Sequence, residues 1–245
     1  MINQNKVIRV TVFFWIMKIL ATTLGETLGD LLSMTFNLGY LVSLGITATF
    51  FLVVLFIQLK TKQLYPYLYW VVIVSTTTVG TEISDFMDRT LGLGYLYGSL
   101  ILLTLLLSTL IIWYKNDKKL TVYPIYLLKI EVLYWVAVLF SNSLGTAFGD
   151  FLSDNIGLSY LTSALATAGV IVIVFLVHQF AKVNQVLLFW IAFIFTRPFG
   201  ATFGDLLTKP LAKGGLDLGT LPATLVTATI LSLFILYTHK KQLSE

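Results

Sequence analysis

The stretch GETLGD, residues 25–30, decides the fold, because closely related stretches recur three more times along the chain. The other copies are GTEISD at 80–85, GTAFGD at 145–150 and GATFGD at 200–205. Each copy begins ten residues after a tryptophan and ends on an aspartate fifteen residues after it. The four pairs are Trp15 and Asp30, Trp70 and Asp85, Trp135 and Asp150, and Trp190 and Asp205. A spacing that is kept four times identifies an internal repeat.

The composition is that of an integral membrane protein. Hydrophobic residues make up 57% of the 245 residues, charged residues only 11%, and the mean hydropathy is +0.88. About a quarter of the residues of a soluble domain are charged, and a membrane-spanning helix needs about 20 apolar residues. The runs that qualify are roughly 10–30, 38–58, 66–86, 93–113, 130–150, 158–178, 186–206 and 219–238. These runs predict an all-α fold, a polytopic membrane helix bundle with eight transmembrane helices and a single membrane domain over residues 1–245.

Each repeat unit is a pair of helices, because a second apolar run follows each motif-bearing run. The units cover about 8–60, 63–115, 128–180 and 183–240. Trp15 and Trp135 are 120 residues apart, as are Trp70 and Trp190, which indicates two successive duplications. An even number of spans per unit gives parallel repeats about an axis along the membrane normal. We expect the four aspartate-bearing helices to surround that axis.

Lysine and arginine predict the orientation. Most of them lie on the side of both termini, whereas the opposite loops hold only Arg89, Lys209 and Lys213. Since cytoplasmic loops carry an excess of positive charge, both termini are expected in the cytoplasm. The formal charge of +4 therefore reflects membrane orientation and gives no reason to expect nucleic acid as a partner. With no cysteine in the chain, disulfides, thiolate metal sites and cysteine nucleophiles are excluded.

These in-register Trp, Gly and Asp positions resemble a bacterial family of membrane proteins of unknown function, built from four tandem repeats of two transmembrane helices, each with a tryptophan. The resemblance covers essentially the whole chain. It implies a multi-pass protein of the bacterial cytoplasmic membrane, and it implies no activity. The chain is more loosely similar to cation exporters with Glu-x-Gly-Asp motifs on facing helices. The first motif here is one residue longer, and the other three lack the glutamate at that place, so this similarity is an analogy.

The motif-bearing helices carry a polar stripe, because positions 7, 11 and 15 after each tryptophan share one helix face. The candidate ligands on or beside this stripe are Glu26, Asp30, Glu82, Asp85, Asp150 and Asp205. The secondary candidates are Asp88, Asp154, Arg197, Thr22, Thr77 and Asn142. Ionised acids clustered at low dielectric must take up protons, pair with cations or bind metal. Oxygen ligands without cysteine or nearby histidine suit hard divalent cations.

The sequence therefore predicts a transporter of a hard divalent cation, with Mn²⁺ first and Mg²⁺ or Ca²⁺ as alternatives. The cation is expected as a bound substrate, no other cofactor is expected, and transport could be coupled to protons. Four aspartates around an axis would also suit a cation channel, and Arg197 would suit an anion transporter. An enzyme acting on lipid is not expected, since the relevant half of the bundle offers no nucleophile and base.

A second class of function competes with transport. Gly25 and Gly29, with their equivalents, form small-xxx-small pairs that let helix backbones approach closely in lipid. The motif of a membrane scaffold would need no more than this packing, and the aspartates could then simply end the helices near the lipid headgroups. The expected partners are the lipid bilayer, an inorganic cation and, through the second helices of the units, another copy of the chain.

Several other residues carry expectations about their surroundings. Lys18 is expected to extend to the cytoplasmic face, whereas Arg197 lies too deep and should pair with an acid on a neighbouring helix. The four tryptophans are predicted to form an inner aromatic belt, and Tyr40, Tyr95 and Tyr160 an outer one. Lys129 and Glu131 are expected to pair at the interface.

Overall fold

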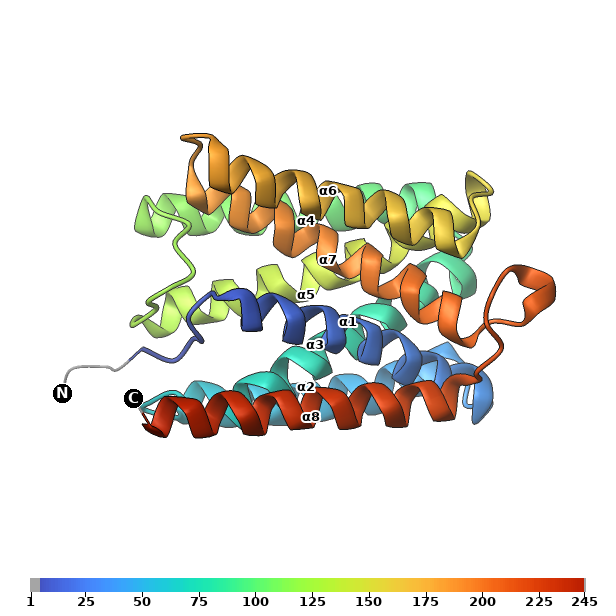
Figure 1. The fold of residues 1–245 in the computed structure, drawn as a ribbon, viewed down its shortest axis with the longest axis horizontal. Helices are drawn as coiled ribbons and strands as arrows, with labels where there is room; N and C mark the ends of the chain where they lie inside the picture. The colour runs from blue at the N-terminus through green and yellow to red at the C-terminus, as the bar shows by residue number, and fades with distance from the viewer. Residues whose placement is uncertain (1–4, 245) are drawn as a thin grey trace.

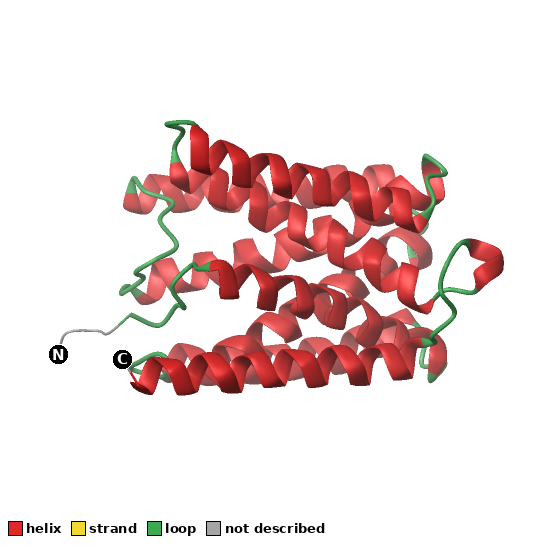
Figure 2. Cartoon of the chain, in the orientation of Figure 1, coloured by secondary structure: helices red, strands yellow, loops and turns green. Residues whose placement is uncertain are grey.

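The computed structural model describes residues 5–244, and in that part of the chain the secondary structure is helical throughout (Figure 2). The α-helices are α1 (Val12–Asp30), α2 (Tyr40–Lys60), α3 (Pro66–Asp85), α4 (Gly94–Asp117), α5 (Leu128–Asp150), α6 (Tyr160–Phe180), α7 (Gln185–Thr208) and α8 (Thr220–Ser244). They run roughly side by side in one bundle (Figure 1). The start of α1 and the end of α8 lie at one end of this bundle, here called the terminal end. The four motifs lie toward the opposite end of the bundle, here called the motif end.

The eight observed helices coincide closely with the predicted runs, and the predicted fold class is confirmed. One feature was missed. In the first three units, the helix does not stop at the motif aspartate but widens into a π-helical segment. These segments are η1 (Leu31–Thr35), η2 (Phe86–Thr90) and η3 (Phe151–Asn155). The aspartates thus lie at the change from α to π geometry, a feature that is frequent at functional sites. In α7 the helix continues to Thr208, and a short 3₁₀ turn, η4 (Leu211–Lys213), follows.

The motif-bearing helices form a closed inner ring. Helix α1 packs against α3 and α7, and α5 packs against the same two helices from the other side. The second helix of each unit lies outside the ring, against the first helix of the next unit: α2 on α3, α4 on α5, α6 on α7 and α8 on α1. The last contact closes the circle, so the four parallel repeats surround one axis. The expected dimer through these outer helices stays a prediction.

Glycines set how closely the ring helices approach. A methyl group added to Gly25 would overlap the side chain of Thr77 in the next unit. The equivalent glycines lie in the same way against the equivalent residues of their next units: Gly80 against Asn142, Gly145 against Arg197 and Gly200 against Thr22. Position 10 of each unit therefore meets position 7 of the next, and close approach of the backbones requires glycine there.

We expect Gly25→Ala to lower the free energy of unfolding by about 1–3 kcal/mol, the usual cost of overpacking a well-packed interior. The added carbon would also lie 2.9 Å from the backbone carbonyl carbon of Thr77, so a rotation of the threonine side chain gives no relief. Gly45→Ala on α2 is the matched control, because nothing lies within 4 Å of the added carbon. Unfolding of both variants in detergent micelles checks the prediction, and equal stabilities would show that the ring tolerates wider spacing.

Within the described residues, seven helices are long and apolar enough to cross a membrane. The exception is α3, which carries consecutive hydroxyl residues at 75–78 and the acids Glu82 and Asp85. Most of α3 is buried in the ring, where polar side chains can meet one another instead of lipid. The protein is a membrane protein whose polar ring helices are enclosed by apolar outer helices.

The prediction of a tryptophan belt facing lipid was wrong for three of the four tryptophans. Trp70, Trp135 and Trp190 are at most 4% exposed, and Trp15 is partly buried. They fill the terminal half of the ring together with Tyr69 and Tyr134, whose hydroxyl groups lie 2.6 Å apart. The reason is geometric: seven residues make nearly two helical turns, so a residue seven positions before the polar stripe faces inward with it.

The predicted interfacial pair of Lys129 and Glu131 was also wrong. Lys129 is exposed, and the buried carboxylate of Glu131 instead pairs with the ammonium group of Lys6 at 2.6 Å. Lys6 belongs to the segment before α1, and its ammonium group also donates to the Leu59 carbonyl group at the end of α2. This pair connects the start of the chain to two later helices.

Candidate cation site

The six carboxylates proposed as ligands all lie inside the ring, between 0 and 5% exposed. This burial bears on the alternative in which the acids end their helices near the headgroups. Solvated acids at a membrane surface need no partner, whereas buried ionised acids cost several kcal/mol unless they are compensated. The negative charge of the cluster must therefore be compensated, and basic side chains of the ring supply part of the compensating positive charge.

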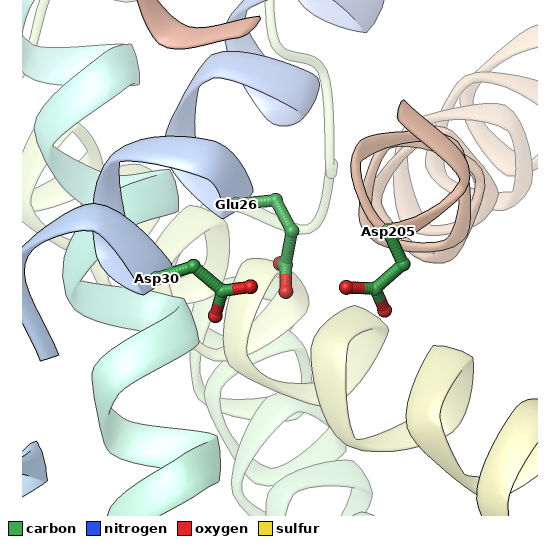
Figure 3. A group of neighbouring side chains, drawn as sticks. All are labelled: Glu26, Asp30 and Asp205. Carbon is green, nitrogen blue, oxygen red and sulfur yellow. The ribbon is translucent and has the colours of Figure 1, made fainter. Parts of the chain in front are cut away.

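Three of the carboxylates converge. Glu26 and Asp30 extend from successive turns of α1, and Asp205 faces them from α7 (Figure 3). One oxygen atom of each lies within 4.8 Å of one oxygen of each of the other two, and all three residues are buried. Among the described residues, this carboxylate trio is the group whose spacing would let three side chains hold one metal ion. Its ligand set, three oxygen atoms from acids, suits a hard cation.

Glu82 adds an unpartnered carboxyl group beside the trio. Its side chain is fully buried in α3, and neither of its oxygen atoms has a hydrogen-bond or ion-pair partner in the described part of the chain. Its Oε1 atom lies near Gly29 of α1, the residue that precedes Asp30. A carboxyl group in this position requires a proton or a bound cation to be stable.

Two basic side chains bridge the four motif aspartates in pairs. The Lys209 ammonium group lies 2.6 Å from Asp30 Oδ2 and 3.1 Å from Asp205 Oδ1. On the opposite side of the ring, Arg89 Nε lies 2.9 Å from Asp85 Oδ1, and Arg89 Nη2 lies 3.2 Å from Asp150 Oδ2. Each basic residue thus joins the aspartate of its own unit to the aspartate of the next unit. Burial opposes the charge on Lys209, yet the Asp205 and Asp30 carboxylates hold the pKa of Lys209 above its usual value.

Sequence reasoning assigned Arg89 and Lys209 only to loops and missed this role. A signal was present. Each lies four residues after its motif aspartate, and the two are separated by the 120 residues that relate the two halves of the chain. Residues four apart on a helix can form an ion pair, so a recurrence of that spacing in both halves pointed to bridging at the ring.

Arg197 crosses the axis on the terminal side of the trio. Its fully buried guanidinium group donates to Glu26 Oε2 at 2.8 Å, to the Thr22 carbonyl oxygen at 3.3 Å and to the Thr81 hydroxyl group of α3. The predicted pairing with an acid on a neighbouring helix is confirmed. The third contact joins α7 to the helix opposite it in the ring, so the guanidinium group closes the axis at this level.

The prediction for Lys18 was wrong. Its side chain is fully buried and donates to Asn142 Oδ1 at 2.9 Å across the ring, and Asn142 in turn donates to the Thr76 hydroxyl group at 3.0 Å. Lys18 cannot reach the terminal surface, because this face of α1 is enclosed by other ring helices. Lys18 and Asn142 form a second closure, nearer to the terminal end than Arg197.

The remaining secondary candidates lie apart from the trio. Thr22 and Thr77 donate to backbone carbonyl groups of neighbouring ring helices, at 3.2 and 3.0 Å, and so hold the ring together. Asp88 lies against Gly98 of α4, outside the ring, and accepts from the Ser84 hydroxyl group at 3.2 Å. Asp154 is exposed and accepts from the Tyr95 hydroxyl group at 3.0 Å.

An open cavity leads from the motif end to the ring. Its volume is about 610 Å³, and its lining includes both acids and bases. The charged lining residues are Asp150, Asp154, Asp205, Arg89, Lys209 and Lys213. The half-buried tyrosines expected in the outer aromatic belt lie at this end, but they face the site: Tyr160 lines the cavity, and Arg89 lies over the rings of Tyr40 and Tyr95, 5.9 and 5.6 Å from their centres. The cavity gives access from the motif end to Asp205 and Lys209.

The fold and the site define a class: a polytopic membrane protein of four two-helix repeats whose inner ring buries a carboxylate cluster. The chain belongs to the family described as Repeat of Unknown Function (DUF347), whose model matches residues 13–63, 68–119, 133–184 and 188–242. Neither a curated protein nor a solved structure matches the chain.

Proposed function

We propose that this protein is a carrier for a hard divalent cation, with Mn²⁺ as the first candidate and Mg²⁺ or Ca²⁺ as alternatives. The observation that carries the proposal is the buried trio of Glu26, Asp30 and Asp205, whose oxygen atoms lie within 4.8 Å of one another. Such a set can replace part of the water shell of a hard cation with carboxylate oxygen atoms. The role proposed is transport, and we assign no catalytic role.

The balance of charge in the ring favours a cation over an anion. The cluster holds six carboxyl groups, and three basic side chains contact them: Arg89, Arg197 and Lys209. Glu82 has neither a hydrogen-bond nor an ion-pair partner among the described residues. The remaining negative charge requires protons or a divalent cation for compensation, whereas an anion would add to the excess.

The same burial argues against a purely structural motif. Close packing of the ring follows from the glycines and from the hydroxyl groups of Thr22 and Thr77. Packing does not require buried acids, and replacement of buried ion pairs by apolar residues is often neutral or stabilising. A scaffold would therefore gain nothing from Glu82, whose carboxyl group makes no hydrogen bond in the described structure.

The closures on the terminal side favour a carrier over a channel. On the terminal side of the trio, the axis is crossed first by Arg197 and then, nearer to the terminal end, by the contact of Lys18 with Asn142. A cation entering through the cavity would reach Asp205, one residue of the trio, and these contacts would block its way beyond the trio, so release on the other side requires a rearrangement. Protonation of Glu82 offers a route to proton coupling, because it would lower the negative charge beside the bound cation. We place the carrier in the bacterial cytoplasmic membrane with both termini in the cytoplasm, as the loop charges suggest.

Uptake into proteoliposomes tests the proposal. Purified protein should accumulate at least one of Mn²⁺, Mg²⁺ and Ca²⁺ faster than protein-free vesicles do, and an excess of the preferred ion should compete with uptake of the others. If none of the three ions enters faster than in protein-free vesicles, in either membrane orientation and with or without a pH gradient, the transport proposal is wrong.

A further inference from the structure

Lys209 holds the place of a cation at the proposed site. Its ammonium group lies 2.6 Å from Asp30 and 3.1 Å from Asp205, which are two of the three residues of the trio. A metal ion bound by all three carboxylates would lie next to an ammonium group that is already in contact with two of them, and the repulsion between the two cations would move the ammonium group away. The structure therefore shows the site with a side chain as its counter-ion.

The equivalent residue in the other half of the chain is chemically different. Arg89 is the residue 120 positions earlier, and its guanidinium group binds Asp85 and Asp150 through separate nitrogen atoms. A guanidinium group is planar, holds its charge permanently and keeps two acids in a fixed geometry, whereas a lysine ammonium group is a point charge on a flexible stem. Arg89 is therefore suited to a permanent ion pair with its two aspartates, whereas Lys209 is suited to a pair that another cation can replace.

The surroundings of Lys209 allow its ammonium group to leave. Lys209 is the first residue after α7, its side chain is 20% exposed, and it lines the 610 Å³ cavity. Glu82, buried and without a hydrogen-bond partner in the described structure, has its Oε1 atom near Gly29, the residue before Asp30. A cation that displaced Lys209 would therefore meet an additional carboxyl group, while the ammonium group could move into an open and partly acidic cavity.

We propose that Lys209 is a tethered counter-cation that the substrate must displace from Asp30 and Asp205. This inference rests on the proposed transport of a divalent cation and concerns the selectivity of the same site. With the site empty, Lys209 pairs with both aspartates and offsets one of their two negative charges. A monovalent ion offers these carboxylates no more charge than the ammonium group already does, whereas a divalent ion offers twice as much. Competition with the tethered ammonium group thus makes the site selective for divalent over monovalent cations.

Mn²⁺ binding to four purified proteins tests this inference: wild type, Lys209→Gln, Lys209→Arg and Lys213→Gln. Loss of the electron paramagnetic resonance signal of free Mn²⁺ measures binding. We expect Lys209→Gln to bind Mn²⁺ at least about 10-fold more tightly than wild type, since it removes a competing charge at contact distance. Lys209→Arg should not bind more tightly than wild type. Lys213→Gln is the matched control, because Lys213 is exposed and lines the same cavity.

An equal gain in Mn²⁺ affinity in Lys209→Gln and Lys213→Gln would overturn the inference, since the gain would then come from the loss of any positive charge near the cavity. Mn²⁺ binding with equal affinity in all four proteins would also overturn it, while leaving the proposed function in place. If none of the four binds Mn²⁺, this ion is excluded as the substrate and the inference fails for it, whereas the proposed function fails only if Mg²⁺ and Ca²⁺ are not taken up either.

A second measurement uses the unmodified protein and so does not depend on the folding of a variant. An amine-acylating reagent followed by peptide mass spectrometry reports how accessible each lysine is. Mn²⁺ should raise the labelling of Lys209 several-fold and leave that of Lys213 unchanged. Labelling of Lys209 that is unchanged or reduced at saturating Mn²⁺ would contradict displacement.

Discussion

Replacement of Arg197 by methionine should lower the free energy of unfolding by about 3–5 kcal/mol, the cost of removing one partner from a buried ion pair. The guanidinium group is fully buried and contacts the carboxylate of Glu26, the hydroxyl group of Thr81 and the carbonyl group of Thr22. Methionine keeps most of the aliphatic stem that packs against Gly145. The loss therefore reports on charge and hydrogen bonding, with little contribution from a cavity.

The double variant Glu26→Gln with Arg197→Met separates the ion pair from the rest of the site. Removal of both charges leaves neither member of this ion pair without its partner, so most of the stability should return. Denaturant unfolding in detergent micelles measures the free energy of unfolding of the wild type, of Arg197→Met and of the double variant. If Arg197→Met alone unfolds like wild type, the crossing of the axis by Arg197 is not a structural feature of the ring.

Replacement of Asp30 or Asp205 by asparagine should reduce Mn²⁺ uptake by about 100-fold or more, because loss even of the outer-shell partners of metal ligands costs 10- to 100-fold. Asparagine keeps the shape of aspartate and removes its charge. Each variant also leaves Lys209 with a single carboxylate, so the ammonium group is held less tightly. This effect alone would make Mn²⁺ binding easier. A large loss would therefore identify the removed carboxylate as a ligand.

Asp154→Asn is the matched control for these variants. Asp154 lines the same cavity, but it is exposed and lies outside the trio. Its replacement should change uptake by less than about twofold, as expected for a screened surface charge. Similar losses in all three variants would show that the acids act only by attracting cations to the motif end.

The architecture could be predicted because its causes lie in local sequence. Apolar runs of membrane-spanning length fix the helices, and the fourfold spacing from Trp15 to Asp30 places the acids on one inward face. That the outer helix of each unit packs on the next unit could not be predicted, because α2 is mostly apolar and the few polar residues of its buried face, Ser43, Thr47 and Gln58, do not specify a neighbour. The partners of the ring residues depend on that arrangement.

The individual misses have a common physical cause. Whether Lys18 reaches the membrane surface depends on which face of α1 meets lipid, and in the closed ring this face meets α5, where Asn142 accepts its hydrogen bond. The partner of Lys209 depends on the packing of α7 on α1, which brings the residue next to Asp30. Contacts between residues 179 positions apart require the closure of the ring by α7 on α1.

Anomalous X-ray scattering from crystals grown with Mn²⁺ tests the central claim most directly, because it locates the ion independently of any flux. The proposal predicts an anomalous peak among the carboxylates of Glu26, Asp30 and Asp205, with the Lys209 ammonium group moved away from both aspartates. A fully ordered ring with Lys209 still bridging Asp30 and Asp205, and with Mn²⁺ only at exposed acids such as Asp154, would contradict it.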